Sequence, residues 1–214
     1  MKKLEIITLF LFILICLGDL IVPYILSIFT PQYSHLKNMM SELGSLQNKV
    51  AIIYNAWLII FGIVFVYFSL YWYCVFIKEY KITALFGMVI LILFGIGSGI
   101  LAGILHIKPG NSASNMASNI HALLLVLGFF GFLFFPVITY SYFKINNHIN
   151  LLILSKILTV TGILFFILFV ISERKVFNNT IIGLSGLWQR LLLVNYYILP
   201  VIISLRRLQI IINN

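Results

Sequence analysis

Apolar stretches of about 20 residues or more run through this sequence, and they constrain its fold more than any other feature. Of the 214 residues 62% are hydrophobic and only 9% are charged, with a mean hydropathy of +1.13. A soluble protein of this length cannot bury so many apolar side chains, because its surface also needs polar cover. About 20 apolar residues are the length of a helix that crosses the hydrocarbon core of a bilayer. The sequence therefore predicts a polytopic integral membrane protein.

Six of these stretches are predicted to be transmembrane helices of a single all-α transmembrane domain covering residues 1–214. Backbone polar groups in lipid are satisfied only within helices or closed barrels. The apolar runs show no strand-like alternation, which favours helices. The six spans are expected at about residues 4–29, 50–77, 82–105, 121–142, 151–171 and 187–205.

The third span carries glycines at every fourth position, namely Gly95, Gly99 and Gly103. Small residues at this spacing let a neighbouring helix backbone approach closely. We interpret this stripe as a helix-packing surface rather than a catalytic feature. The sequence leaves open whether it packs within the chain or between copies.

The stretch SHLKNMMSELG, residues 34–44, is expected to form a short amphipathic helix in the first outer loop. Ser34 would cap its start and Gly44 its end. Its apolar side chains recur at the spacing of one helix face, namely Leu36, Met39, Met40 and Leu43. Such a helix would lie on the membrane surface with Glu42 on its polar face.

The connections between the spans predict a cell-membrane protein with both termini in the cytoplasm. Lysine and arginine residues are nearly balanced between the two sides of the membrane, so the charge bias alone does not determine the orientation of the helices. The connections at 78–81 and 143–150 are short, whereas those at 30–49, 106–120 and 172–186 are longer and richer in polar residues. We place the short connections inside and the elaborate ones outside.

The net charge of +9 comes from 14 basic and 5 acidic residues. The basic residues lie singly or in pairs at the ends of apolar runs, where they are expected to contact lipid headgroups. No basic stripe interleaved with aromatic residues is present, so we expect membrane lipids as partners and no nucleic acid.

A polar segment, HIKPGNSASNMASNIH at residues 106–121, interrupts the apolar pattern before the fourth span. Pro109 and Gly110 indicate a turn, and Asn111 is a favourable helix N-cap. From there Asn111, Asn115 and Asn119 recur every four residues, and Ser118 and His121 continue along the same side. The segment is predicted to be an amphipathic entry to the fourth helix.

The ionisable residues near this segment predict a polar pocket that opens to the outer face. Asp19 lies roughly 15 Å below the outer end of the first helix, at 1.5 Å per residue. A carboxylate at that depth costs about 2.5–3.5 kcal/mol, so it needs a partner or a function. The candidate catalytic residues are Asp19, Glu42, His106 and His121, and the candidate substrate-binding residues are Asn111, Asn115, Ser118, Asn119 and Arg190.

Each candidate also has a structural interpretation, which the sequence leaves open. Asp19 and Arg190 would form a buried ion pair that fixes helix register. The asparagines and serines would hydrogen-bond between helices. The two histidines would make ordinary interfacial hydrogen bonds, and Glu42 would be the solvated face of its short helix.

No bound cofactor is expected. A zinc site would use His106, His121 and Asp19 as ligands with an open position, but the sequence has no HExxH or similar spacing. Haem ligation would use the same two histidines, and no other residue pattern indicates it.

Three stretches, YSHLKNMMSELGS, PGNSASNMASNIH and GLWQRLL, resemble domain-of-unknown-function family 998 (DUF998), a group of small six-helix prokaryotic membrane proteins. The resemblance covers nearly the whole chain. It implies six spans and a polar cluster at the outer face, and it implies no activity. A weaker similarity exists to six-helix proteins that remodel lipid anchors.

Two classes of function fit these observations. The first is a protein that binds or modifies a lipid or lipid-linked substrate in the outer pocket; a histidine or carboxylate would act as a base, and Arg190 would hold negative charge. The second is a non-enzymatic transporter, sensor or assembly partner of another membrane protein. The sequence does not decide whether the protein is an enzyme.

Overall fold

The computed structural model describes residues 2–105, 123 and 126–213, and this part of the chain is helical without any strand. It contains six helices long and apolar enough to cross a membrane, which confirms the predicted fold class for the described residues. Five of the spans consist of α1 (Lys2–Ser27), α2 (Ala51–Phe76), the segment Lys81–Ile104, α7 (Ile149–Ser172) and α8 (Ser185–Asn213), and the remaining one is Val126–Ile145.

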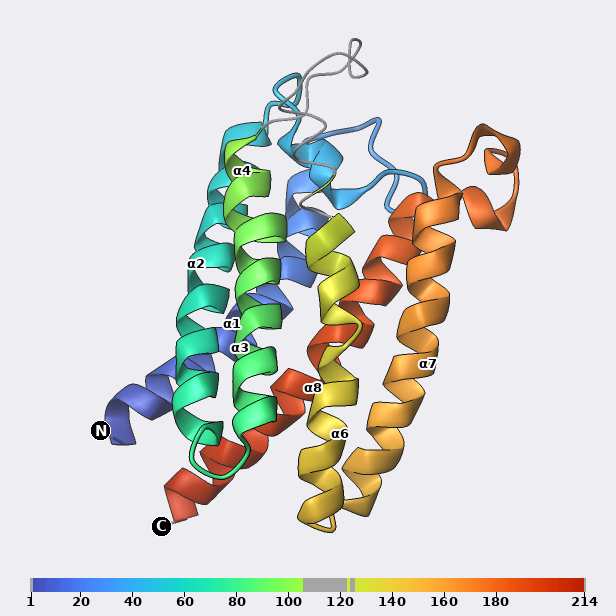
Figure 1. Cartoon of the computed structure of the whole chain (residues 1–214). Helices are drawn as coiled ribbons and strands as arrows, with labels where there is room; N and C mark the ends of the chain where they lie inside the picture. The colour runs from blue at the N-terminus through green and yellow to red at the C-terminus, as the bar shows by residue number, and fades with distance from the viewer. Residues whose placement is uncertain (1, 106–122, 124–125, 214) are drawn as a thin grey trace.

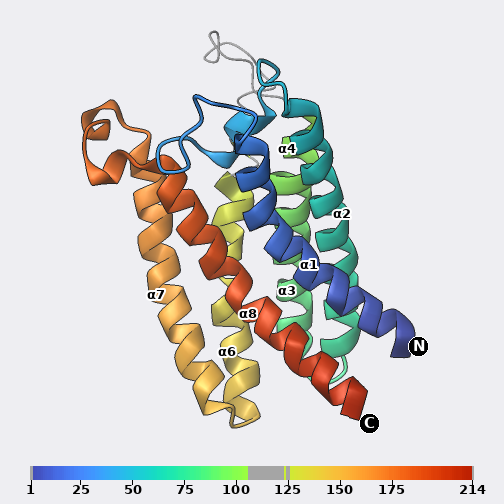
Figure 2. The same ribbon diagram turned by 180° about the vertical axis from the view of Figure 1, so that it is seen from behind.

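Both termini lie at one end of the bundle, which we call the terminal end (Figure 1). The short turns at residues 77–80 and 146–148 lie at the same end, whereas the longer connections at 28–50 and 173–184 lie at the opposite, loop end. Figure 2 shows α1 and α8 crossing obliquely over one side of the bundle, and these two helices pack against each other. Helix α8 extends to Asn213, eight residues beyond the expected end at 205.

The third span changes its helical winding at the glycine stripe. It begins as α3 (Lys81–Phe94), continues as a π-helix (Gly95–Leu101), and ends with the single turn α4 (Ala102–Ile104). The π segment packs directly on α2: a Cβ added to Gly99 would lie 2.5 Å from the Cα of Gly62. The glycine stripe is therefore an intramolecular packing surface, as one of the two sequence interpretations held.

The fourth span is interrupted near its middle, although the sequence predicted one continuous helix. Residues 126–132 are helical, Leu133 and Phe134 form a turn with i→i+3 hydrogen bonds, and α6 (Phe135–Ile145) follows with Pro136 in its first turn. Proline has no N–H to donate and its ring clashes with the carbonyl four residues earlier, so it is favoured in the first turn of a helix. Pro136 thus explains why the span is built from two segments.

Aromatic rings fill the middle of the bundle. Phe65 on α2 is fully buried, and its ring centroid lies 4.5–6.4 Å from those of Phe12, Phe61, Phe94, Phe132 and Tyr197. Tilted and edge-to-face pairs at these separations add to the stability that burial alone gives. This aromatic core brings together residues from α1, α2, α3, the fourth span and α8.

The short helix predicted in the first outer loop is present, but it differs from the expected one. It is a 3-10 helix over Met40–Gly44 rather than a helix from Ser34. Met40 and Leu43 are almost completely buried inside the protein, so its apolar side does not lie on a membrane surface. The segment folds inward because α8 offers it hydrogen-bonding partners, described next.

Candidate functional site

Arg190, in the second turn of α8, fixes the loop of residues 28–50 to the bundle. Its Nη1 donates hydrogen bonds to the carbonyl oxygens of His35 (2.6 Å), Asn38 (3.3 Å) and Gly186 (2.8 Å). Its Nη2 donates to Tyr33 Oη at 2.7 Å and contacts His35 Nδ1 at 3.2 Å. The planar guanidinium offers several donors in fixed directions, which suits it to gather backbone carbonyls in this way.

The contact with Arg190 sets the protonation of His35. A guanidinium can only donate, so His35 Nδ1 must accept, and its proton resides on Nε2. Nε2 then donates to Ser27 Oγ at 2.9 Å. Partial burial, and next the positive charge of Arg190, lower the pKa of His35 from its ordinary 6.5. The loop therefore favours the neutral imidazole, which also stacks on the ring of Tyr24 at a centroid distance of 4.0 Å.

Glu42, a predicted catalytic residue, organises the same loop. Its Oε1 accepts the backbone N–H of Met39 at 2.7 Å and its Oε2 accepts Asn38 Nδ2 at 2.8 Å. Asn38 Oδ1 in turn accepts the N–H of Ser34 at 2.8 Å. Both carboxylate oxygens are thus engaged in holding the turn that leads into the 3-10 helix.

The first turns of α8 hold the loop through further contacts that the sequence analysis missed. Gln189 Oε1 accepts the N–H of Met40 at 2.7 Å, and Ser185 Oγ donates to the carbonyl of Lys37 at 2.6 Å. Gln189 is only 4% exposed, which is unusual for an amide side chain unless it is hydrogen-bonded. The signal available in the sequence was the polar pair Gln189–Arg190 within the otherwise apolar GLWQRLL.

Asp19, the predicted floor of the outer pocket, is buried deeper in the bundle. Its Oδ2 accepts the hydroxyl of Tyr197 at 2.6 Å, and its Oδ1 is 3.4 Å from the donor Trp57 Nε1. It lines a cavity of about 30 Å³ together with Tyr54, Ser98 and Gln189. A cavity of that size accommodates water rather than a substrate.

The ion pair between Asp19 and Arg190 is not formed, so that interpretation was wrong. The N–H groups of Arg190 instead donate hydrogen bonds to backbone carbonyls and to Tyr33. Tyr197, which binds Asp19, follows Arg190 by seven residues, roughly 10 Å along the helix. Among the residues that the structure describes, the ion pair present is instead Arg207–Glu5.

A polar groove of about 380 Å³ lies on the loop of residues 28–50, beside the contacts of Arg190 and Glu42. All of its described lining residues are polar: Thr30, Gln32, Tyr33, Asn38, Glu42, Ser45, Gln47 and Asn48. Within the described part of the chain, Thr30 Oγ1 and Ser45 Oγ are buried oxygens with no hydrogen-bond partner. Burial in the loop also raises the pKa of Tyr33, and the positive charge of Arg190 opposes that shift. Of the groove residues, Glu42 alone was predicted from the sequence to be a site residue.

The other predicted site residues lie outside the part of the chain that the structure describes. They are the candidate catalytic residues His106 and His121 and the candidate binding residues Asn111, Asn115, Ser118 and Asn119. The zinc and haem alternatives rest on the same two histidines. Among the described residues, no three histidine, cysteine or acidic side chains lie close enough to hold a metal ion.

Taken together, six apolar helices and a polar loop end define a multi-pass α-helical membrane protein. A model of the family described as "Protein of unknown function (DUF998)" matches residues 13–206, nearly the whole chain, and the chain belongs to this family. The resemblance noted in the sequence is thereby confirmed. No curated protein and no solved structure matches the chain.

Proposed function

We propose that this protein binds or modifies a lipid or lipid-linked substrate at the loop end, with the polar part of the substrate in the groove of residues 30–48. The observation that carries the proposal is the groove itself, about 380 Å³ in volume and lined by hydrogen-bonding side chains on a loop fixed by Arg190. Clefts of this volume that are held in a preformed shape are typical small-ligand sites.

The lining residues favour a headgroup rich in hydroxyl groups. Amides and hydroxyls both donate and accept hydrogen bonds, as sugars and polyols require. The described lining holds no lysine or arginine, so a phosphate would find no cation there. Its single carboxylate, Glu42, already accepts two hydrogen bonds within the loop.

The position of the groove favours a substrate that is anchored in the membrane. The loop connects α1, which ends at Ser27, to α2, which begins at Ala51, so it lies at the level where the helices leave the lipid. Ile28 and Phe29 are 75% and 64% exposed directly before Thr30. Their apolar surface would contact acyl chains while the headgroup lies among the polar residues.

The sequence candidates that lie outside the described residues keep their expected roles in this proposal. His106 and His121 would supply the acid–base chemistry of a modification reaction, and the amides and hydroxyls of Asn111, Asn115, Ser118 and Asn119 would contribute hydrogen bonds. Both termini would be cytoplasmic, so that the groove faces the outside of the cell membrane.

Native mass spectrometry of the detergent-purified protein tests the binding step. The probes are a glucosyl-diacylglycerol and a diacylglycerol with the same acyl chains. Wild type should bind the glycolipid more tightly than the diacylglycerol. The double variant Gln32→Ala/Gln47→Ala, which removes two groove amides, should lower that affinity about tenfold or more, because two hydrogen bonds of about 1 kcal/mol each are lost.

The matched control is Asn178→Ala/Asn179→Ala, which removes two exposed amides from the other described loop at this end. It should bind the glycolipid as wild type does. Equal binding of the two probes by wild type, or equal losses in both double variants, would contradict the proposal.

A further inference from the structure

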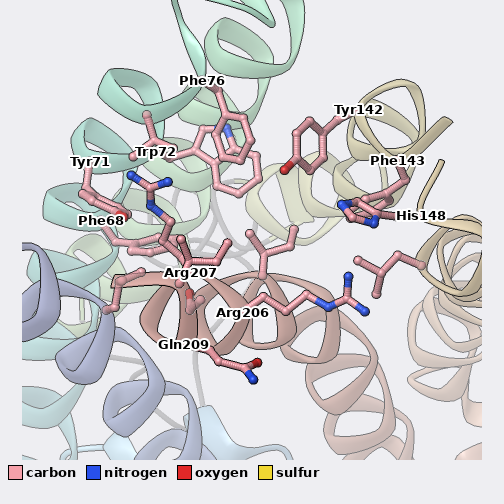
Figure 3. A pocket seen from close by; sticks show the side chains of 16 residues that line it. Phe68, Tyr71, Trp72, Phe76, Tyr142, Phe143, His148, Arg206, Arg207 and Gln209 are labelled. Atoms are coloured by element: carbon pink, nitrogen blue, oxygen red, sulfur yellow. The ribbon is translucent and has the colours of Figure 1, made fainter. Parts of the chain in front are cut away.

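A second groove, of about 370 Å³, lies at the terminal end of the bundle, opposite the loop end. It is lined by residues of α2, α6, α7 and α8, and by Leu9 of α1 (Figure 3). One wall is aromatic, with Phe68, Trp72 and Phe76 of α2 and Phe143 of α6. A volume of this size is typical of a small-molecule site.

The polar side of this groove carries two consecutive arginines that differ in their partners. Arg207 Nε donates to Glu5 Oε1 at 2.8 Å, and Tyr71 Oη donates to the same oxygen at 2.8 Å. Glu5 therefore neutralises Arg207. The side chain of Arg206 is exposed and has neither a hydrogen bond nor an ion pair with any residue that the structure describes. Figure 3 shows its guanidinium extending along the groove toward the side on which His148 lies.

From this arrangement we propose that the terminal-end groove binds an anionic phospholipid. Its phosphate would pair with Arg206 beside His148, and one acyl chain would lie along Phe68, Trp72 and Phe76. An aromatic wall next to an uncompensated guanidinium matches a molecule with an apolar chain and a negative headgroup. Arginine suits a phosphate because its guanidinium donates two parallel hydrogen bonds.

The surroundings of the groove favour the membrane as the source of this ligand. The terminal end also carries exposed basic residues near the expected headgroup level, namely Lys2, Lys3, Lys78, Lys81 and Lys144. Basic residues at a membrane surface attract anionic lipids, and basic pockets between transmembrane helices bind their headgroups. This site is separate from the loop-end groove, so it does not depend on the proposed function.

Binding of two phospholipids with identical acyl chains tests the assignment. Phosphatidylglycerol and phosphatidylcholine are titrated separately into the detergent-purified full chain and followed by native mass spectrometry. Wild type should prefer phosphatidylglycerol about tenfold. Arg206→Gln should remove that preference, whereas Lys144→Gln, an exposed cation at the same end but outside the lining, should retain it. Equal losses in both variants would reduce the effect to general surface charge and overturn the proposal.

The acyl part is tested by filling the groove. Val75→Trp places a large ring among the lining residues and should abolish the tight binding of phosphatidylglycerol. Ile63 lies on the same helix and is 55% exposed, and Ile63→Trp should leave that binding unchanged. Inorganic phosphate at millimolar concentration should fail to displace the lipid. Displacement by phosphate, or unchanged binding in Val75→Trp, would show that no acyl chain occupies the groove.

A fluorescence measurement covers the case in which Val75→Trp does not fold. In Trp57→Phe/Trp188→Phe the remaining tryptophan is Trp72, in the groove wall. Phosphatidylglycerol with brominated acyl chains should quench its emission more strongly than brominated phosphatidylcholine. Equal quenching by the two lipids would overturn the proposal.

Discussion

The hydroxyl of Tyr197 on α8 donates a hydrogen bond of 2.6 Å to Oδ2 of Asp19 on α1, and both residues are buried. The bond joins the first and last helices of the bundle where they pack together. An acidic side chain inside a membrane span is expected to have a partner. Here the partners are a phenol and an indole rather than a cation.

Tyr197→Phe should destabilise the protein by about 1–2 kcal/mol, because Asp19 loses its shorter hydrogen bond in a buried position. Tyr24→Phe is the control, since the Tyr24 side chain is 53% exposed and its ring stacking survives the change. Reversible unfolding in detergent measures the free-energy difference. Equal stability of Tyr197→Phe and wild type would show that this bond does not hold α1 to α8.

Arg190→Lys should release the loop of residues 28–50 although the charge is retained. Lysine has a single compact ammonium group instead of a planar guanidinium. It therefore cannot hydrogen-bond to the carbonyls of His35 and Gly186 and to the hydroxyl of Tyr33 at the same time. Limited trypsin digestion should cleave after the exposed Lys37 at least tenfold faster than in wild type. The comparison is Arg174→Lys, an exposed position at the same end, for which cleavage after Lys37 should keep the wild-type rate.

The lowered pKa of His35 makes the stability of the loop depend on pH. The folded state binds fewer protons at this imidazole than the unfolded state does. Its contribution to stability is therefore complete above the ordinary pKa of 6.5 and is lost as the pH falls from there through the lowered pKa of the folded state. The thermal midpoint of wild type should drop between pH 7.5 and pH 5.5. His35→Gln should show a smaller drop over the same interval, and an identical drop would exclude His35 as the titrating group.

Gly99→Ala should cost about 1–3 kcal/mol, because the new methyl group would lie 2.5 Å from the backbone of Gly62 and the two helices would have to separate. Gly131→Ala is the matched change in the fourth span, where an added Cβ meets nothing within 4 Å. Its stability should stay near that of wild type. Unfolding in detergent compares the two variants, and similar losses would mean that the cost reflects glycine replacement in general.

The all-α class and the six apolar helices could be predicted, because the apolar run that lipid requires is a local property of the chain. The sequence predicted neither the π segment at Gly95–Leu101 nor the turn at Leu133 and Phe134. Both arise from packing and backbone hydrogen bonding that an apolar pattern does not record. Pro136 was the one visible signal for the second.

The partners of the polar residues were harder to predict than their presence. Arg190 binds mainly backbone carbonyls of a loop about 155 residues away in the chain, and a sequence displays only side chains. Asp19 is satisfied by Tyr197, whose hydroxyl sits within an apolar run. The terminal-end groove had no signal in the sequence, since it results from how α2, α6 and α8 are placed relative to one another.

The central claim is that a membrane-anchored substrate occupies the loop-end groove, and photo-cross-linking in intact membranes tests it most directly. A benzophenone amino acid replaces Gln47 in the groove, or the exposed Lys49 outside its lining as control. After illumination, the mass of the adduct identifies the neighbour. The account predicts a lipid or lipid-linked adduct at position 47 and much less at position 49. A protein adduct at position 47, or equal lipid adducts at both positions, would contradict it.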